Sequence, residues 1–158
     1  MFYPVLPERY EFRPDTAGGG EFRGGLGLRL VYRVLQDCYM HFAFERVKCP
    51  PWGLFGGKPA KTGGVLIHRP GKAEPEFHLK TTSMWLETGT RVELLSAGGG
   101  GRGHPALRPA ERVLEDVRQG YVTVEGARRD YGVVIDAAAI AVDVQATAEL
   151  RARMMEKE

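Results

Sequence analysis

The chain is short of the features that would tie it to a membrane, to nucleic acid or to an oxidising compartment. Its 158 residues include two cysteines, Cys38 and Cys49, which are too few for a disulfide scaffold. The 22 basic residues nearly balance the 20 acidic ones, so no strong attraction to nucleic acid or to an anionic membrane is predicted. No apolar run approaches the ~20 residues that a spanning helix requires, and the first residues do not resemble a signal peptide. We therefore expect a cytoplasmic protein without nucleic-acid or membrane partners.

Sequence motifs for catalysis and metal binding are also lacking. The four histidines have no metal-ligand spacing, and neither CxxC nor HExxH occurs; the histidines are His41, His68, His78 and His104. No pattern places a nucleophile beside a general base. We expect no metal and no cofactor on this segment. Its catalytic residues are unknown, and we expect the chain alone to be inactive.

Glycine is abundant instead, with 21 residues, and its runs imitate two nucleotide-binding patterns. Residues 56–58 read Gly-Gly-Lys, but a Walker loop needs Gly in place of Trp52 and Ser or Thr in place of Pro59. Residues 98–103 satisfy GxGxxG, but Pro105 separates them from the next predicted helix, whereas a dinucleotide loop opens directly into one. We interpret this second run as a loop whose backbone approaches another backbone closely.

Residues 1–104 have the patterns of a β-rich region. Apolar residues alternate over residues 26–35, which predicts a strand with one buried face. Met40, Phe42 and Phe44 continue this alternation after a turn, so we expect the two segments to pair as a long hairpin. Shorter strands are expected at Val65–His68, Phe77–Leu79 and Arg91–Leu95.

The pattern becomes helical after Pro105. We expect two short helices and a final strand within residues 105–136, and a helical tail over residues 137–158. Thr123 is expected to cap the second helix and Gly132 to end it. The predicted fold class is α+β, with a twisted, mainly antiparallel β-sheet region followed by short C-terminal helices. Together these regions are expected to form one domain.

The loop over residues 49–59 combines a stiff backbone with large aromatic side chains. Pro50 and Pro51 restrict the backbone at its start, and glycines follow. Trp52 and Phe55 stand where surface loops usually carry small polar residues. We expect these rings to pack against the core, so that Trp52→Ala would cost roughly 3–5 kcal/mol. The alternative is a surface that faces a partner.

Four segments carry distinctive patterns that together span nearly the whole chain. They are ERYEFRPDTAGGGEFRGGLGLRLVYRVL (8–35), CPPWGLFGGKPAKTGG (49–64), SAGGGGRGHP (96–105) and LEDVRQGYVTVEGARRDYGVVID (114–136). In content and order they resemble segments of the hydantoinase B/oxoprolinase family, which includes N-methylhydantoinase B-type subunits. His104 and Arg102 depart from the Asp and Tyr that relatives usually carry at these places.

The resemblance implies an ATP-dependent hydrolase of cyclic amides such as hydantoin or 5-oxoproline, with carboxylases as relatives. In that family an A-type subunit handles ATP and a B-type subunit completes ring opening. The resemblance also implies that the complete enzyme uses ATP and a divalent metal. Family members are several times longer, and we expect this chain to correspond to their C-terminal part, as a fragment, a split-gene product or a truncated reading frame. Hydantoin, 5-oxoproline, lactams and ketones stay open as substrates.

Expected partners follow from the same resemblance. They are a hydantoinase A-type subunit and the N-terminal part of a B-type subunit, and we expect the chain to form homo-oligomers because an incomplete domain exposes apolar surface. The alternative is a non-catalytic assembly module or remnant that docks on a partner subunit.

Candidate residues for substrate or interface contact lie in or beside the matching segments. They are Arg23, Glu45, Arg46, Trp52, Lys58, Gly99 and Gly100. For the Glu45-Arg46 pair, we favour a salt bridge that holds the preceding strand to the aromatic loop over an anion contact.

Overall fold

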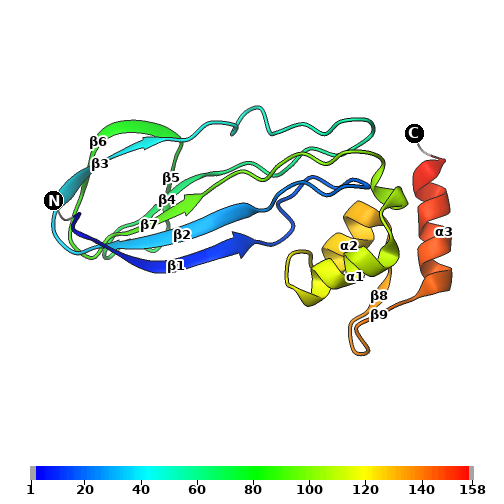
Figure 1. Cartoon of the computed structure of the whole chain (residues 1–158). Coiled ribbons are helices and arrows are strands. Elements are labelled where there is room, and N and C mark those ends of the chain that lie inside the picture. Colours follow the sequence, from blue (N-terminus) through cyan, green and yellow to red (C-terminus); the bar gives the residue numbers. More distant parts are fainter. Residues whose placement is uncertain (1–2, 157–158) are drawn as a thin grey trace.

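The computed structural model describes residues 3–156 and shows an elongated molecule with a β-sheet at one end and helices at the other (Figure 1). Long glycine-containing segments connect the two ends. The α+β class with antiparallel sheets and C-terminal helices is thereby confirmed.

Five strands form the main sheet, in the spatial order β1-β2-β7-β4-β5. All neighbours are antiparallel; the strands are β1 (Val5–Arg13), β2 (Gly27–Val34), β4 (Gly64–His68), β5 (Glu76–His78) and β7 (Arg91–Leu95). A separate two-stranded sheet pairs β3 (Cys38–Ala43) with β6 (Lys80–Leu86). The first core lies between these sheets and consists of Val34, Phe42, Val65, Ile67, Leu86 and Val92.

The expected hairpin of residues 26–35 with residues 40–44 is wrong. β2 exists, but it pairs with β1 and β7, while β3 pairs with β6 in the other sheet. Val34 and Phe42 nevertheless belong to one core cluster, so the chain crosses from one layer to the other between them. Alternation reports which face of a strand is buried, and it carries no information about the pairing partner.

The helical end contains η1 (Pro105–Leu107), α1 (Ala110–Arg118), α2 (Val124–Tyr131), β8 (Ile135–Asp136), β9 (Ala141–Val142) and α3 (Val144–Met155). The predicted cap of α2 is confirmed, since the Thr123 hydroxyl accepts a hydrogen bond from the Gly126 N–H at 2.9 Å. Gly132 ends α2 with φ 64°. The second core consists of Val113, Val122, Ala127, Tyr131, Val133 and Ile135.

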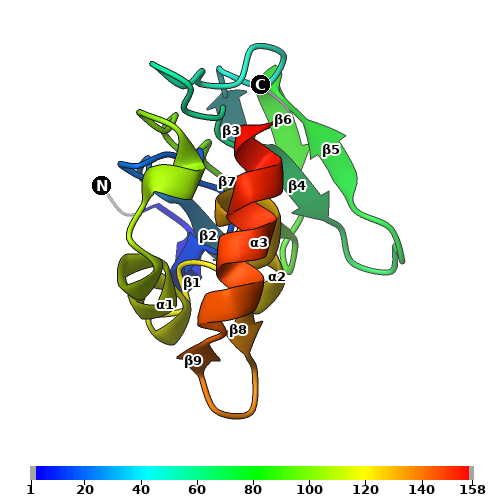
Figure 2. The same cartoon turned by 90° about the vertical axis from the view of Figure 1, so that its right-hand side faces the viewer.

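Helix α3 lies on the outer side of this end (Figure 2). Asp143 caps it by accepting a hydrogen bond from the Ala146 N–H at 2.9 Å. Arg151 then attaches the helix to the rest of the molecule, because its guanidinium donates to the carbonyl oxygens of Tyr131 at 3.2 Å and Arg108 at 2.6 Å.

Three glycine-containing segments join the two ends, and we call residues 18–25, 53–58 and 98–101 the glycine junction. Backbone hydrogen bonds tie them together: Gly18 N–H donates to Gly99 O at 2.8 Å, and Lys58 N–H donates to Gly19 O at 2.7 Å. A Cβ on Gly24 would overlap the carbonyl oxygen of Gly99, and one on Gly100 would overlap that of Trp52. The close backbone approach predicted for residues 98–103 is therefore confirmed.

Candidate functional site

The predicted residue Arg23 projects from the glycine junction toward α1. Its Nε and Nη2 atoms each lie 3.2 Å from a carboxylate oxygen of Asp116, and Arg108 Nη2 donates to Asp116 Oδ2 at 2.9 Å. The Arg23 guanidinium also lies over the Tyr121 ring, 5.6 Å from its centroid. Asp116 is only 6% exposed, so two cations neutralise a buried carboxylate that links the junction to the helices.

The surroundings of Arg23, Asp116 and Arg108 are largely buried. Burial raises the pKa of Tyr131 to about 12, although the nearby charges of Arg108 and Arg23 favour the phenolate. The Nε of Arg108 is buried and has no hydrogen-bond partner among the residues that the structure describes. The arrangement anchors one element to another and presents no nucleophile.

The predicted pair Glu45 and Arg46 does not hold the strand to the loop by a salt bridge. The Glu45 carboxylate contacts Lys80 Nζ at 3.2 Å, in a strongly exposed ion pair. Arg46 instead lies over the ring of Trp52, 5.4 Å from its centroid. The contact between strand and loop is therefore a cation–π interaction.

The expectation that the aromatic loop packs its rings against the core is wrong. Trp52 is 65% exposed and Phe55 is 80% exposed. The backbone of the loop packs instead: Leu54 N–H donates to Gly101 O at 2.9 Å, and Ala60 N–H donates to Pro51 O at 2.9 Å. The close contacts of the loop with its neighbours are therefore made by its backbone and not by its aromatic rings.

The structure brings several predicted residues together and separates others. A cleft of about 330 Å³ is lined by Arg46, Pro51, Trp52, Gly98 and Gly99. Gly100 lies so close to the Trp52 carbonyl oxygen that a Cβ on Gly100 would overlap it. Lys58 is exposed and belongs to the 53–58 segment of the glycine junction. The side chains of Arg23 and Glu45 contact other elements, α1 and β6, respectively.

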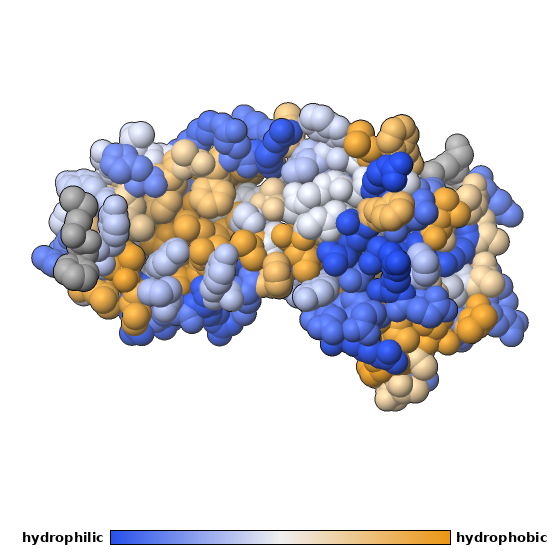
Figure 3. All heavy atoms as spheres, viewed as in Figure 1, coloured by the Kyte–Doolittle hydropathy of each residue, from blue (hydrophilic) through white to orange (hydrophobic). Residues whose placement is uncertain are grey.

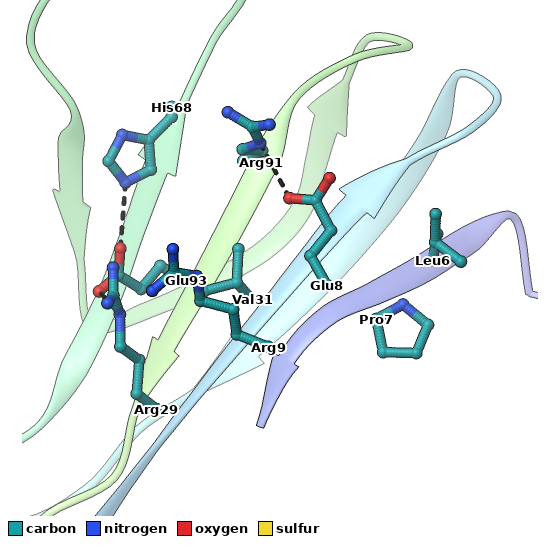
Figure 4. Close-up of a pocket in the computed structure, with 9 residues that line it drawn as sticks. All are labelled: Leu6, Pro7, Glu8, Arg9, Arg29, Val31, His68, Arg91 and Glu93. Atoms are coloured by element: carbon teal, nitrogen blue, oxygen red, sulfur yellow. Dashed lines mark hydrogen bonds and ion pairs between the residues drawn. The ribbon is translucent and has the colours of Figure 1, made fainter. Parts of the chain in front are cut away.

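A polar hollow of about 570 Å³ on the main sheet is a second candidate, which the sequence patterns did not indicate (Figure 4). Glu93 of β7 lies at its centre and is 8% exposed. Arg29 Nε lies 2.7 Å from Glu93 Oε1, and His68 Nε2 lies 3.3 Å from Glu93 Oε2. Glu8 of β1 contacts Arg91 at 2.9 Å. Each of these carboxylates is paired with a guanidinium.

Electrostatics keep Glu93 ionised. Burial alone would raise its pKa, but the hydrogen bond and charge of Arg29, helped by His68, outweigh burial and lower the pKa below its usual value. The carboxylate reciprocally raises the pKa of Arg29. A carboxylate held in this state suits an ion-pair network, and it is unsuited to serve as a general acid.

Within residues 3–156, no group of three or more His, Cys, Asp or Glu side chains is placed to hold a metal ion. The same described part of the chain has no helix that is long and apolar enough to cross a membrane.

Comparison with known proteins places these features in one family. The model of the Hydantoinase B/oxoprolinase family matches residues 1–105, and the chain belongs to this family. It is similar to the beta subunit of caprolactamase from Pseudomonas jessenii, with 42% identity over 138 residues, which are 85% of this chain and 24% of the relative. It is also similar to the putative D-/L-hydantoinase B-type subunit of Pseudomonas sp. (strain NS671), with 31% identity over 94% of this chain and 25% of the relative.

A solved structure gives the same relationship. The crystal structure of the ATP-dependent caprolactamase from Pseudomonas jessenii superimposes with a TM-score of 0.82 and 35% identity, over 95% of this chain and 26% of that one. The chain thus spans about a quarter of the length of the relatives that it matches, and it corresponds to a C-terminal part of a B-type subunit.

Proposed function

We propose that this chain supplies the C-terminal section of a B-type subunit in a complex that hydrolyses a cyclic amide with ATP. The observation that carries the proposal is the match to the beta subunit of caprolactamase over 85% of the chain. That match includes sheet, junction and helices together, because the superposition with the caprolactamase structure covers 95% of the chain. A lactam or hydantoin ring is the substrate class that these relatives' names favour.

The proposed contribution of this section is architectural. The most buried charged groups near the junction neutralise one another, in the triad of Arg23, Asp116 and Arg108. We propose that ATP and a divalent metal bind elsewhere in the complete enzyme, and that the chain alone does not turn over substrate. Regions 1–104, 105–136 and 137–158 would form one C-terminal domain of the longer protein, in the cytoplasm.

The proposed partners are an A-type subunit and the N-terminal part of a B-type subunit. Apolar surface along the sheet end supports such association (Figure 3). Tyr10 and Phe12 of β1 are 71% and 54% exposed, although they lie on the same face as Leu28 and Leu30 of β2. A face of this kind is usually covered in an assembled protein. Self-association into homo-oligomers would cover it as well.

A second candidate function is a non-catalytic assembly module. The exposed aromatic loop favours it, because large exposed rings beside arginine are typical of binding surfaces. Such a module would bind a partner subunit without being needed for turnover.

A domain exchange tests the proposal. The matching quarter of the caprolactamase beta chain is replaced by this chain, and the hybrid is combined with its companion subunit. We expect ATP-dependent caprolactam hydrolysis well above that of the beta chain lacking this quarter. A folded hybrid that is no more active than the truncated beta chain would overturn the proposed function. A truncated beta chain that retains full activity would favour the assembly module.

A further inference from the structure

Side chains from three chain segments that meet at or beside the glycine junction form one exposed surface patch, which we define as Phe22, Leu54, Phe55 and Arg102. The exposed fractions of its apolar side chains are high: 49% for Phe22, 53% for Leu54 and 80% for Phe55. Arg102 is also exposed. They come from distant parts of the sequence, so the fold gathers them.

The patch rests on a fixed backbone. Phe22 and Arg102 exchange two backbone hydrogen bonds of 3.0 and 2.9 Å, and Leu54 N–H donates to Gly101 O at 2.9 Å. Three hydrogen-bonded backbone segments therefore hold these side chains next to one another. A surface that is rigid before binding loses little conformational entropy when a partner arrives.

Arg102 lies close to two aromatic rings. Its guanidinium carbon is 5.5 Å from the ring centroid of Phe22 and 5.5 Å from that of Phe55. These cation–π contacts do not use the N–H groups of the guanidinium as hydrogen-bond donors to an acceptor atom. No described residue accepts a side-chain hydrogen bond from Arg102 or forms an ion pair with it. The patch therefore carries an unpaired positive charge amid apolar side chains.

Phe55 is held in an unfavourable backbone conformation. Its φ is 52° and that of Gly56 is 83°, and the Gly57 N–H donates to Leu54 O at 3.0 Å. This turn has left-handed residues at both central positions, where Asn-Gly is strongly preferred and a bulky residue is an outlier. The fold thus retains a strained residue whose ring is 80% exposed and contributes little to the core.

We propose that this patch is the surface through which the chain docks on a different subunit of its enzyme complex. The occupant is a polypeptide surface of that companion subunit, with apolar side chains around a carboxylate that accepts hydrogen bonds from the guanidinium of Arg102. The positive charge of Arg102 is complementary to a carboxylate, and the three apolar side chains around Arg102 are complementary to apolar surroundings. Aromatic residues and arginine are the types that dominate binding energy at protein interfaces. The inference rests on the proposed function, because it names a partner within that complex.

Phe55→Asn separates an interface from a structural role. Asn suits the left-handed conformation, so the full chain carrying this substitution should melt at or above the parent temperature. In the hybrid chain described above, the same substitution should reduce the affinity for the companion subunit about 30-fold or more, as measured by titration calorimetry. Arg102→Gln should weaken binding while leaving the melting temperature unchanged. Tyr39→Thr is the matched control, since Tyr39 is 63% exposed on β3, and it should leave binding unaltered.

Each other outcome overturns the inference. A Phe55→Asn hybrid that binds within twofold of the parent hybrid removes the patch from the interface. If the Phe55→Asn chain melts far below the parent, the Phe55 ring stabilises the fold and does not serve an interface. If the substitution dissolves a homodimer, as seen by sedimentation, and leaves binding to the companion subunit intact, the occupant is a second copy. An unsubstituted hybrid that is inactive contradicts the proposed function, whereas an active one that tolerates both substitutions contradicts only the docking surface.

Discussion

Two neighbouring glycines of the junction should respond oppositely to the same substitution. A Cβ on Gly24 would overlap the carbonyl oxygens of Gly99 and Gly100, far inside the 3.0 Å below which real Cβ contacts are essentially never found. A Cβ on Gly25 would meet nothing within 4 Å. Gly24→Ala should therefore destabilise the fold strongly, and Gly25→Ala should not. Because the two positions are adjacent, the comparison holds sequence context constant.

The expected loss for Gly24→Ala follows from the hydrogen bonds at this place. Gly24 N–H donates to Gly18 O at 3.1 Å, and Gly99 N–H donates to Gly25 O at 2.8 Å. Relieving the overlap requires a separation of ~1 Å or more, which takes such bonds beyond normal hydrogen-bond distance. Each of these hydrogen bonds involves a backbone group that is at least partly buried, and losing such a bond costs ~1–3 kcal/mol, so we expect a loss of about 3–5 kcal/mol in total.

Gly25→Ala should stay within about 0.5 kcal/mol of the parent, or gain slightly because alanine lowers the conformational entropy of the unfolded chain. Urea unfolding followed by far-ultraviolet circular dichroism measures both variants. Equal stabilities for the two variants, or a loss below about 1 kcal/mol for Gly24→Ala, would refute the view that backbone contact holds the junction together.

Three further outcomes can be checked by the same unfolding measurements. Asp116→Asn should cost roughly 3 kcal/mol or more, because it leaves two buried guanidinium groups without their carboxylate; a loss below about 1 kcal/mol would count against the anchoring role. Trp52→Ala should cost no more than ~1 kcal/mol, since the exposed ring contributes mainly its contact with Arg46; a larger loss would restore the buried interpretation. The Tyr131 pKa is raised from 10.0 to about 12, so its stabilising effect is full below pH 10 and disappears as the pH rises through 12. Tyr131→Phe should be less sensitive to pH in this window, and an unchanged profile would contradict this.

Features encoded by local hydrogen bonding could be predicted from the sequence. The Thr123 cap and the Gly132 terminus are both present where expected. A cap depends on a side chain and an N–H three residues away, so a short window contains the whole interaction.

Strands β1 and β6 were not predicted, for physical reasons. Strand β1 is an edge strand with both faces largely exposed, and its register shifts between Pro7 and Arg9, so no clean alternation exists. Strand β6 contains Ser83 at φ 52°, opposite a register shift in β3, which disturbs its period in the same way. Irregular strands take their conformation from their neighbours.

The candidate site was predictable in part only. The glycine runs indicated close backbone approach, and their positions were right. Nothing near Arg23 indicates its partner, because Asp116 lies 93 residues further along the chain. The aromatic loop misled for a different reason: composition indicates stiffness, but it does not say whether the backbone or the rings make the contact.

The glycine junction has a consequence for how this family can change during evolution. Any single base change that replaces glycine, rather than leaving it silent, produces a residue that carries a Cβ, or a stop codon. At positions such as Gly24 and Gly100, every such step places an atom inside a neighbouring backbone. Packing alone would therefore preserve these glycines in descendants, independently of any function of the protein. Retention of Phe22 and Phe55 would be more telling, since folding makes no comparable demand on an exposed ring.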